Sequence, residues 1–168
     1  ESAKIELEDV PVDLRTIFDG MRDLFSEQMK QKKIDFQVHT SQVQNYYVWC
    51  DRKNLNRVLL NIISNAYKFT PEGGAVTASL MEIGSAEHDY GSYEIRVQDT
   101  GIGMSKEFAE RMFNAFERER TSTVSGVEGT GLGLSITKGI VDLMGGTIDV
   151  LTAPGSGTQF VIRMKLRL

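Results

Sequence analysis

The stretch NIISNAYKFT, residues 61–70, carries two asparagines and a lysine within an otherwise apolar run. Asparagine is a weaker helix former than Glu, Lys or Gln, so a face that only meets water would carry those residues at lower cost. At 100° per residue, one narrow stripe, separate from the apolar stripe, holds Asn54, Asn61, Asn65 and Lys68. This stripe is either a solvated polar face or a binding face. A binding face of amide oxygens and an ammonium group suits Mg²⁺ and phosphate.

A second candidate lies in VQDTGIGM, where Asp99 ends an alternating strand pattern and Gly101 and Gly103 follow. Glycines permit a close approach of the backbone to a flat ligand. A buried carboxylate there can accept a hydrogen bond from the exocyclic amine of adenine, whereas guanine has a carbonyl oxygen at that place. This favours ATP over GTP, because an unpaired buried carboxylate is costly. The alternative is that DTG is simply a turn.

The third candidate is EGTGLGLSITKG, in which Gly129, Gly131 and Gly133 lead into a helix. A helix N-terminus offers free N–H groups and a positive dipole end to phosphate. Leu134 and Ile136 break the G-x-G-x-x-G spacing, and the P-loop order of Gly, Lys and Ser or Thr is missing as well. The segment is therefore either a phosphate loop outside those two folds or only a helix cap.

Hydrophobic periodicity predicts the elements that must position these residues. Helices are expected from Leu14 to Met29 after the N-cap Asp13, from the N-cap Asp51 to about Phe69, and over 131–144. Residues 115–130 lack periodicity and are expected to be mobile. Strands are expected at 3–7, 34–38, 46–50, 71–84, 91–101, 147–151 and 158–166. These elements fit one mixed sheet with its helices on one face, which is a two-layer α/β arrangement.

The composition indicates one globular domain over residues 1–168, with 40% hydrophobic and 25% charged residues and a net charge of −4. This charge gives no basic field for nucleic acid or anionic lipid. No stretch approaches the roughly 20 apolar residues that span a bilayer, and no signal peptide opens the chain. The single cysteine, Cys50, is expected to be a small buried residue in a reducing, cytoplasmic setting. The start at Glu1 suggests a fragment of a longer protein.

Five motifs follow one another along the chain, and their order is informative: NIISNAYKFT, DTGIGM, MFNAFER, GTGLGL and GSGTQF. Together they resemble the catalytic, ATP-binding domain of sensor histidine kinases, in the superfamily of gyrase, chaperone, kinase and mismatch-repair ATPases. The resemblance covers nearly the whole chain. It implies a Bergerat-type α/β sandwich, with a mixed sheet covered on one face by three helices and a flexible lid over the nucleotide. It also implies ATP and Mg²⁺ as ligands.

The resemblance assigns roles by position. Asn65 corresponds to the Mg²⁺ ligand, Asn61 faces the same phosphates, and Lys68 contacts phosphate. Phe69 lies beside the base and Asp99 reads adenine. The further nucleotide-binding positions are Gly101, Gly103, Gly129, Thr130, Gly131, Leu132, Gly133 and Thr158. The lid has two anchoring phenylalanines and an arginine that reaches the terminal phosphate, namely Phe113, Phe116 and Arg118. Thr158 is otherwise a hydroxyl at a strand start, and Arg118 a solvated charge.

Asn61 discriminates between members of the superfamily. Members that hydrolyse ATP or phosphorylate serine resemble each other in carrying a glutamate there, which acts as general base. An amide takes up no proton near neutral pH, whereas a neutral imidazole is already nucleophilic, so Asn61 fits transfer to histidine. His39 and His88 lack the sequence context of the family's phospho-accepting histidine and are expected at the surface.

The expected partners are therefore a dimerisation domain that carries the accepting histidine and the receiver domain of a response regulator. We expect no nucleic-acid partner and no direct membrane contact by this domain, although the parent can be a membrane-bound sensor. The isolated fragment is expected to be monomeric. A catalytically silent nucleotide-binding module and an ATPase of the same superfamily are the alternatives.

Overall fold

The structure, a computed structural model, describes residues 6–84, 87–112 and 131–168. Seven strands form one sheet, with the order β1-β3-β7-β5-β4-β2 and with β6 paired to β7. The β2–β4 pair is parallel and the other pairs are antiparallel. The strands are β1 (Val10–Asp13), β2 (Asp35–Gln42), β3 (Tyr47–Cys50), β4 (Ala75–Glu82), β5 (Tyr90–Asp99), β6 (Thr147–Thr152) and β7 (Thr158–Arg167).

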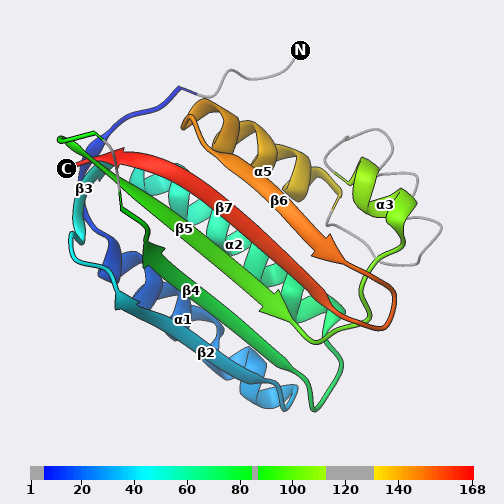
Figure 1. Cartoon of the computed structure of the whole chain (residues 1–168). Coiled ribbons are helices and arrows are strands. Elements are labelled where there is room, and N and C mark those ends of the chain that lie inside the picture. Colours follow the sequence, from blue (N-terminus) through cyan, green and yellow to red (C-terminus); the bar gives the residue numbers. More distant parts are fainter. Residues whose placement is uncertain (1–5, 85–86, 113–130) are drawn as a thin grey trace.

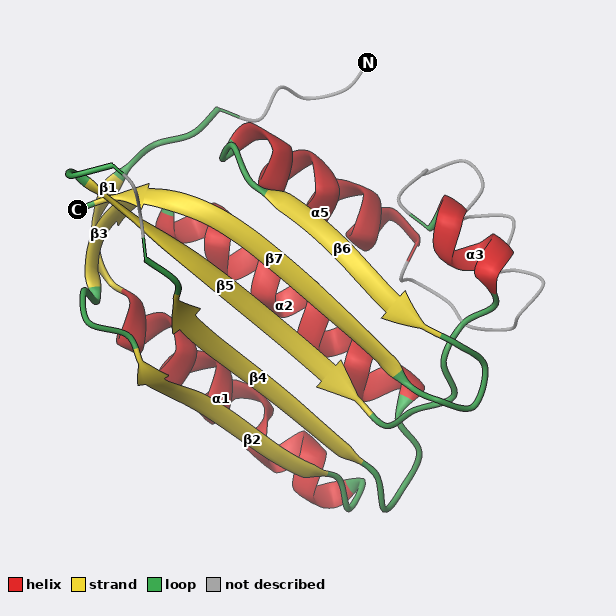
Figure 2. Ribbon diagram, in the orientation of Figure 1, coloured by secondary structure: helices red, strands yellow, loops and turns green. Residues whose placement is uncertain are grey.

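Three helices cover one face of this sheet, which gives the predicted two layers (Figures 1 and 2). They are α1 (Leu14–Gln31), α2 (Arg52–Phe69) and α5 (Gly131–Leu143). The short helix α3 (Lys106–Arg111) follows the loop after β5. No helix within the described ranges is long and apolar enough to cross a membrane.

The two long N-terminal helices form where the sequence predicts them. Asp13 caps α1 by accepting from the Arg15 N–H, and Asp51 caps α2 by accepting from the Asn54 N–H, both at 3.0 Å. The Asn54 amide also donates to Asp51, so this asparagine belongs to the cap rather than to a binding face. The apolar stripe of α2 is buried against the sheet through Leu55, Val58, Leu59, Ile62, Ile63 and Ala66.

The prediction of a strand over 3–7 is wrong where it can be examined. Residues 3–5 lie outside the described residues, and Leu7 lies in an irregular segment with 39% of its surface exposed. The strand forms instead at β1, because Val12 reaches the core there and the segment pairs with β3. Pro11 is compatible with this place, since β1 is an edge strand and needs fewer N–H donors.

The expectations for Cys50 and the two histidines are confirmed, and the predicted set of helices was incomplete. Cys50 is buried, and burial together with the nearby Asp9 carboxylate raises the pKa of its thiol to about 11. His39 and His88 are exposed. Helix α3 was not predicted; its signal is Ser105, whose hydroxyl accepts from the Phe108 N–H as an N-cap. The expected mobile segment 115–130 lies outside the described residues.

The loop after β5 is hydrogen-bonded to the end of α2 on one side and to the β6–β7 turn on the other. The Ile102 N–H donates to the Phe69 carbonyl at the end of α2, at 3.1 Å. The Ile102 carbonyl accepts from the Gly155 N–H in the β6–β7 turn, at 2.7 Å. Gly103 has φ +71°, and a Cβ there would lie 1.9 Å from the Ala153 carbonyl oxygen. The loop therefore requires glycine at position 103 for two independent reasons.

Gly103→Ala should destabilise the fold far more than Gly155→Ala. Gly155 also has a positive φ, +79°, but a Cβ there meets nothing within 4 Å. We expect a loss of about 1–2 kcal/mol in the free energy of unfolding for Gly155→Ala and roughly 3 kcal/mol or more for Gly103→Ala. Urea denaturation of both variants measures the difference, and equal losses would contradict the close packing of this loop.

Candidate nucleotide-binding site

The site is built around Asp99, the last residue of β5. Only 3% of Asp99 is exposed, and its Oδ1 accepts hydrogen bonds from the Gly101 N–H at 2.8 Å and the Thr158 N–H at 3.2 Å. A Cβ on Gly101 would lie 2.2 Å from the Phe69 carbonyl oxygen. The glycine thus lets the loop fold back over the carboxylate while the end of α2 packs against it.

Burial raises the pKa of Asp99, and the two N–H donors oppose that shift only in part. A carboxylate that is ionised in such a place lacks the water that would normally solvate it. It is therefore suited to accept a hydrogen bond from a ligand that enters the site, such as the exocyclic amine of adenine.

Asn65 supplies the second polar centre. The residue is 1% exposed and lies on α2, one helical turn before Phe69, whose carbonyl contacts the Asp99 loop. Within the part of the chain that the structure describes, two buried side-chain atoms have no hydrogen-bond partner: Asn65 Oδ1 and Thr70 Oγ1. A buried carbonyl oxygen without a donor is costly, and a metal ion or a ligand donor would satisfy it.

The unpaired Oδ1 of Asn65 tests whether the residues of this site suit Mg²⁺. Mg²⁺ prefers oxygen ligands and usually keeps waters and phosphate oxygens around one or two protein ligands. No group of three or more His, Cys, Asp or Glu side chains in the described ranges could hold a metal ion. The Oδ1 of Asn65 has the right chemistry for a single protein ligand, so the residues present fit the magnesium prediction.

Asn61 joins α2 to α5. Its Nδ2 donates to the hydroxyl oxygen of Thr137 at 3.1 Å, and Thr137 is fully buried. The two helices run in opposite directions (Figure 1). Gly131 lies six residues before Thr137, about 9 Å along α5, and the same distance leads from Asn61 to Tyr67 on α2. The first turn of α5 therefore lies level with residues 65–67.

The structure thus groups most of the sequence-predicted residues that it describes. The backbones of Gly131, Leu132 and Gly133 form the first turn of α5. Lys68 is exposed and Phe69 half-buried at the end of α2. The remaining predicted positions, Arg118, Gly129 and Thr130, together with the lid residues Phe113 and Phe116, lie outside the described residues.

Thr158 is buried at the start of β7, and its hydroxyl lies 2.9 Å from the Thr152 hydroxyl. Thr152 also accepts from the Met104 N–H and donates to the Gly157 carbonyl, both at 3.0 Å. Sequence reasoning missed Thr152, which ties the loop after β5 to the β6–β7 turn. Its one signal was its place at the end of a strand, immediately before the turn APGSG.

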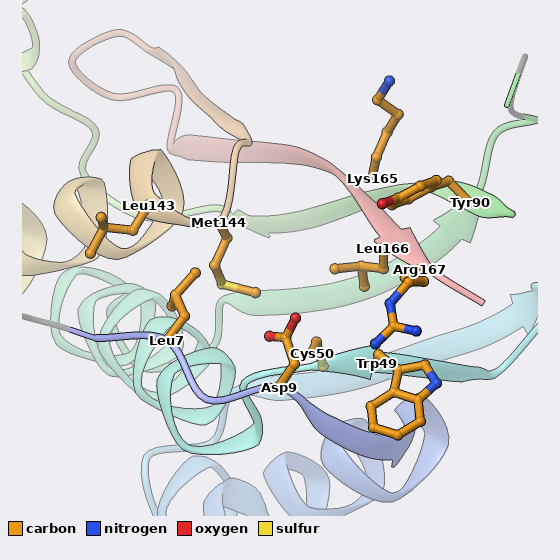
Figure 3. A pocket seen from close by; sticks show the side chains of 10 residues that line it. All are labelled: Leu7, Asp9, Trp49, Cys50, Tyr90, Leu143, Met144, Lys165, Leu166 and Arg167. Atoms are coloured by element: carbon orange, nitrogen blue, oxygen red, sulfur yellow. The ribbon is translucent and has the colours of Figure 1, made fainter.

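A hollow lies at the opposite end of the sheet from Asp99 and takes no part in this site. Its lining includes Leu7, Trp49, Tyr90 and Met144, and in Figure 3 the Lys165 side chain points away from Asp9 and Cys50. Tyr90 and Asp99 are the first and last residues of β5, so this hollow lies about 30 Å from the carboxylate.

Comparison with known proteins identifies the family to which this chain belongs. Residues 50–168 match the family described as histidine kinase-, DNA gyrase B-, and HSP90-like ATPase. The chain is 34% identical over 166 residues to the sensor protein GacS of Pseudomonas syringae pv. syringae, a match that covers 99% of this chain and 18% of that protein. It is 35% identical over 170 residues to the virulence sensor protein BvgS of Bordetella bronchiseptica, covering 100% and 13%. The chain belongs to this ATPase family, and it spans less than a fifth of either relative.

Solved structures show the same fold. The structure of full-length ShkA in complex with AMPPNP matches with a TM-score of 0.82 and 30% identity, covering 99% of this chain and 33% of that one. The catalytic domain of the histidine kinase ThkA, in a nucleotide-free form, matches with a TM-score of 0.74 and 25% identity, covering 94% and 95%. The predicted α/β sandwich and the resemblance to sensor histidine kinases are confirmed: this is a kinase-type ATPase domain.

Asp99→Asn should stabilise the nucleotide-free chain and weaken ATP binding. The pKa of Asp99 is raised in the folded state, so the fold becomes less stable as pH rises from the ordinary value of about 3.9 through the raised one. Near neutral pH the amide removes this cost, and we expect a higher melting temperature. The new NH₂ group would oppose the adenine amine, which should lower ATP affinity about 10- to 100-fold.

Thermal melting between pH 4 and 8 and calorimetric titration with ATP measure both effects. Asp149→Asn, at a carboxylate with a 67% exposed side chain, is the matched control and should change neither. A lower melting temperature for Asp99→Asn at neutral pH would contradict the assigned burial cost.

Asn65→Ala should weaken ATP binding only when magnesium is present. Removing an unpaired buried oxygen offsets the lost packing, so the melting temperature should change little. We expect ATP affinity to fall at least about 10-fold in Mg²⁺ and to stay unchanged in EDTA. Ser64→Ala, on the same helix, is the control. An equal loss with and without the metal would exclude Asn65 as its ligand.

Proposed function

We propose that this chain binds ATP together with Mg²⁺ and donates the γ-phosphoryl group to a histidine on a separate dimerisation domain, as the catalytic part of a two-component sensor kinase. The observation that carries the proposal is the pair of amides on α2. Asn65 presents a buried unpaired oxygen, and Asn61 stands where hydrolysing relatives are expected to carry a glutamate.

Adenine would be held at the carboxylate end of the site. Asp99 Oδ1 is already engaged by two N–H groups, which fixes the orientation of the carboxylate. Phe69 and Thr158 lie next to it through the contacts described above. We assign the exocyclic amine of adenine to Asp99, the base to the neighbourhood of Phe69, and a second polar contact to Thr158.

The phosphates would extend from Asp99 along α2 toward the first turn of α5. Asn65 Oδ1 is the proposed Mg²⁺ ligand, and the bound ion would neutralise charge on the phosphates. Lys68 adds a positive charge one turn from Asn65, and the N–H groups of Gly131, Leu132 and Gly133 add the positive end of a helix dipole. We assign Arg118, Gly129 and Thr130 to the same end of the nucleotide by their place in the sequence.

The acceptor nitrogen would attack the γ-phosphorus, forming an N–P bond while the bond to the bridging oxygen of ADP breaks. An imidazole with a free lone pair needs no base to expose it, which suits an amide at position 61. Position 61 would therefore contribute contact with the phosphates rather than proton transfer.

The accepting histidine is assigned to another domain. His39 and His88 are both exposed and lie away from the Asp99 loop, on β2 and in the segment before β5. ThkA has been solved in complex with the response regulator TrrA, which supports a receiver domain as the next partner. We propose a cytoplasmic location, where ATP is available, and a monomeric state for this fragment on its own.

The test supplies the missing acceptor. The chain is mixed with the histidine-bearing domain of the parent protein and ATP labelled at the γ-phosphate, and we expect label on that domain that is lost in acid and kept in base. An acceptor domain with its histidine replaced by alanine is the control. Binding of Mg-ATP without label would instead indicate a silent regulatory module, and steady phosphate release without acceptor would indicate an ATPase; either result overturns the proposal.

A further inference from the structure

A buried hydroxyl lies in the middle of the apolar face of α5. Thr137 is fully buried, and its neighbours on that face are Leu134, Ile140 and Val141. A valine would fill the same space without a polar group to desolvate, so a hydroxyl at this depth is costly unless it is hydrogen-bonded. Thr137 has such a partner in Asn61 Nδ2, at 3.1 Å and 76 positions away in the chain.

We propose that Thr137 is a positioning residue, whose hydroxyl holds the side-chain amide of Asn61 in the orientation that the magnesium–nucleotide site uses. The inference rests on the proposed binding of Mg-ATP, but not on the proposed transfer to histidine. It adds a residue that lies outside the phosphate-facing stripe of α2 and outside the glycine-rich turn of α5.

The chemistry of the pair selects one of the two amide orientations. The hydroxyl hydrogen of a helical threonine ordinarily goes to the carbonyl of residue i−4, which leaves the oxygen as an acceptor. An acceptor takes the N–H end of an amide and repels its carbonyl end. With Nδ2 turned toward Thr137, Asn61 Oδ1 is turned away from the Thr137 hydroxyl. Replacing Thr137 with a residue that lacks the hydroxyl removes this acceptor from Asn61 Nδ2.

The same bond aligns the two elements that would handle phosphate. Asn61 and Asn65 lie one turn apart on α2, and the first turn of α5 lies level with residues 65–67 when Asn61 faces Thr137. The hydroxyl of Thr137 thereby orients the amide of Asn61 relative to the N-terminus of α5.

The experiment is a double-mutant cycle between Thr137 and Asn61 on this chain, read out as ATP affinity by calorimetry in Mg²⁺ and in EDTA. We expect Thr137→Val to weaken Mg-ATP binding about 3- to 10-fold, the size of one lost hydrogen bond, and to leave ATP affinity in EDTA unchanged. Thr137→Ser keeps the hydroxyl and should restore most of the affinity. In the Asn61→Ala background, Thr137→Val should cause no further loss.

Three outcomes would overturn the proposal: wild-type Mg-ATP affinity for Thr137→Val, an equal loss in EDTA, or full additivity with Asn61→Ala. The last two would mean that Thr137 acts only by packing. Melting temperatures establish that each variant is folded, and Thr137→Ala, which also lacks the hydroxyl, replaces Thr137→Val in the cycle if valine prevents folding.

The cycle also separates this proposal from the proposed kinase activity. If the chain binds Mg-ATP but labels no histidine, the phosphotransfer proposal fails while the coupling between Thr137 and Asn61 is still measured. If the wild-type chain shows no magnesium-dependent ATP binding, both proposals are overturned.

Discussion

Asp99 is held out of water at the end of β5, where the N–H groups of Gly101 and Thr158 donate to its Oδ1. This arrangement requires three segments to meet: the loop after β5, the start of β7 and the end of α2, whose Phe69 carbonyl receives the Ile102 N–H. Burying a carboxylate costs stability, and the raised pKa of Asp99 records that cost. The arrangement therefore provides a buried carboxylate to which a ligand could donate a hydrogen bond.

Helix α2 links this carboxylate to the rest of the site because it serves two purposes at once. Its apolar stripe is buried against the sheet, while Asn61 donates to Thr137 on α5 and Asn65 Oδ1 has no donor. Asp99 and Asn65 are thus both buried polar groups in unfavourable surroundings. One turn of α2, from Asn65 to Phe69, and the hydrogen bond from the Ile102 N–H to the Phe69 carbonyl connect them. A single ligand with an amine at one end and metal-bound phosphates at the other would give Asp99 a further hydrogen-bond donor and Asn65 Oδ1 a metal ion.

The sequence allowed much of this to be predicted, because the relevant signals are local. The caps Asp13 and Asp51, the periodicity of α1 and α2 and the place of Asp99 at a strand end all follow from short-range pattern. The strand over 3–7 was wrong because pairing with β3, which no local pattern reveals, selects Val10–Asp13. Thr137 and Thr152 were missed because their hydrogen bonds join positions 76 and 48 residues apart, which only the tertiary fold brings together.

The central claim is that Asp99 and the amides of α2 bind one adenine nucleotide together with magnesium. Calorimetric titration of the chain with ATP and with GTP, each in Mg²⁺ and in EDTA, tests it most directly. The account predicts that ATP binds at least about 100-fold more tightly than GTP in Mg²⁺ and that EDTA weakens ATP binding. Equal affinities for the two nucleotides, or an ATP affinity that does not change when the metal is removed, would contradict it.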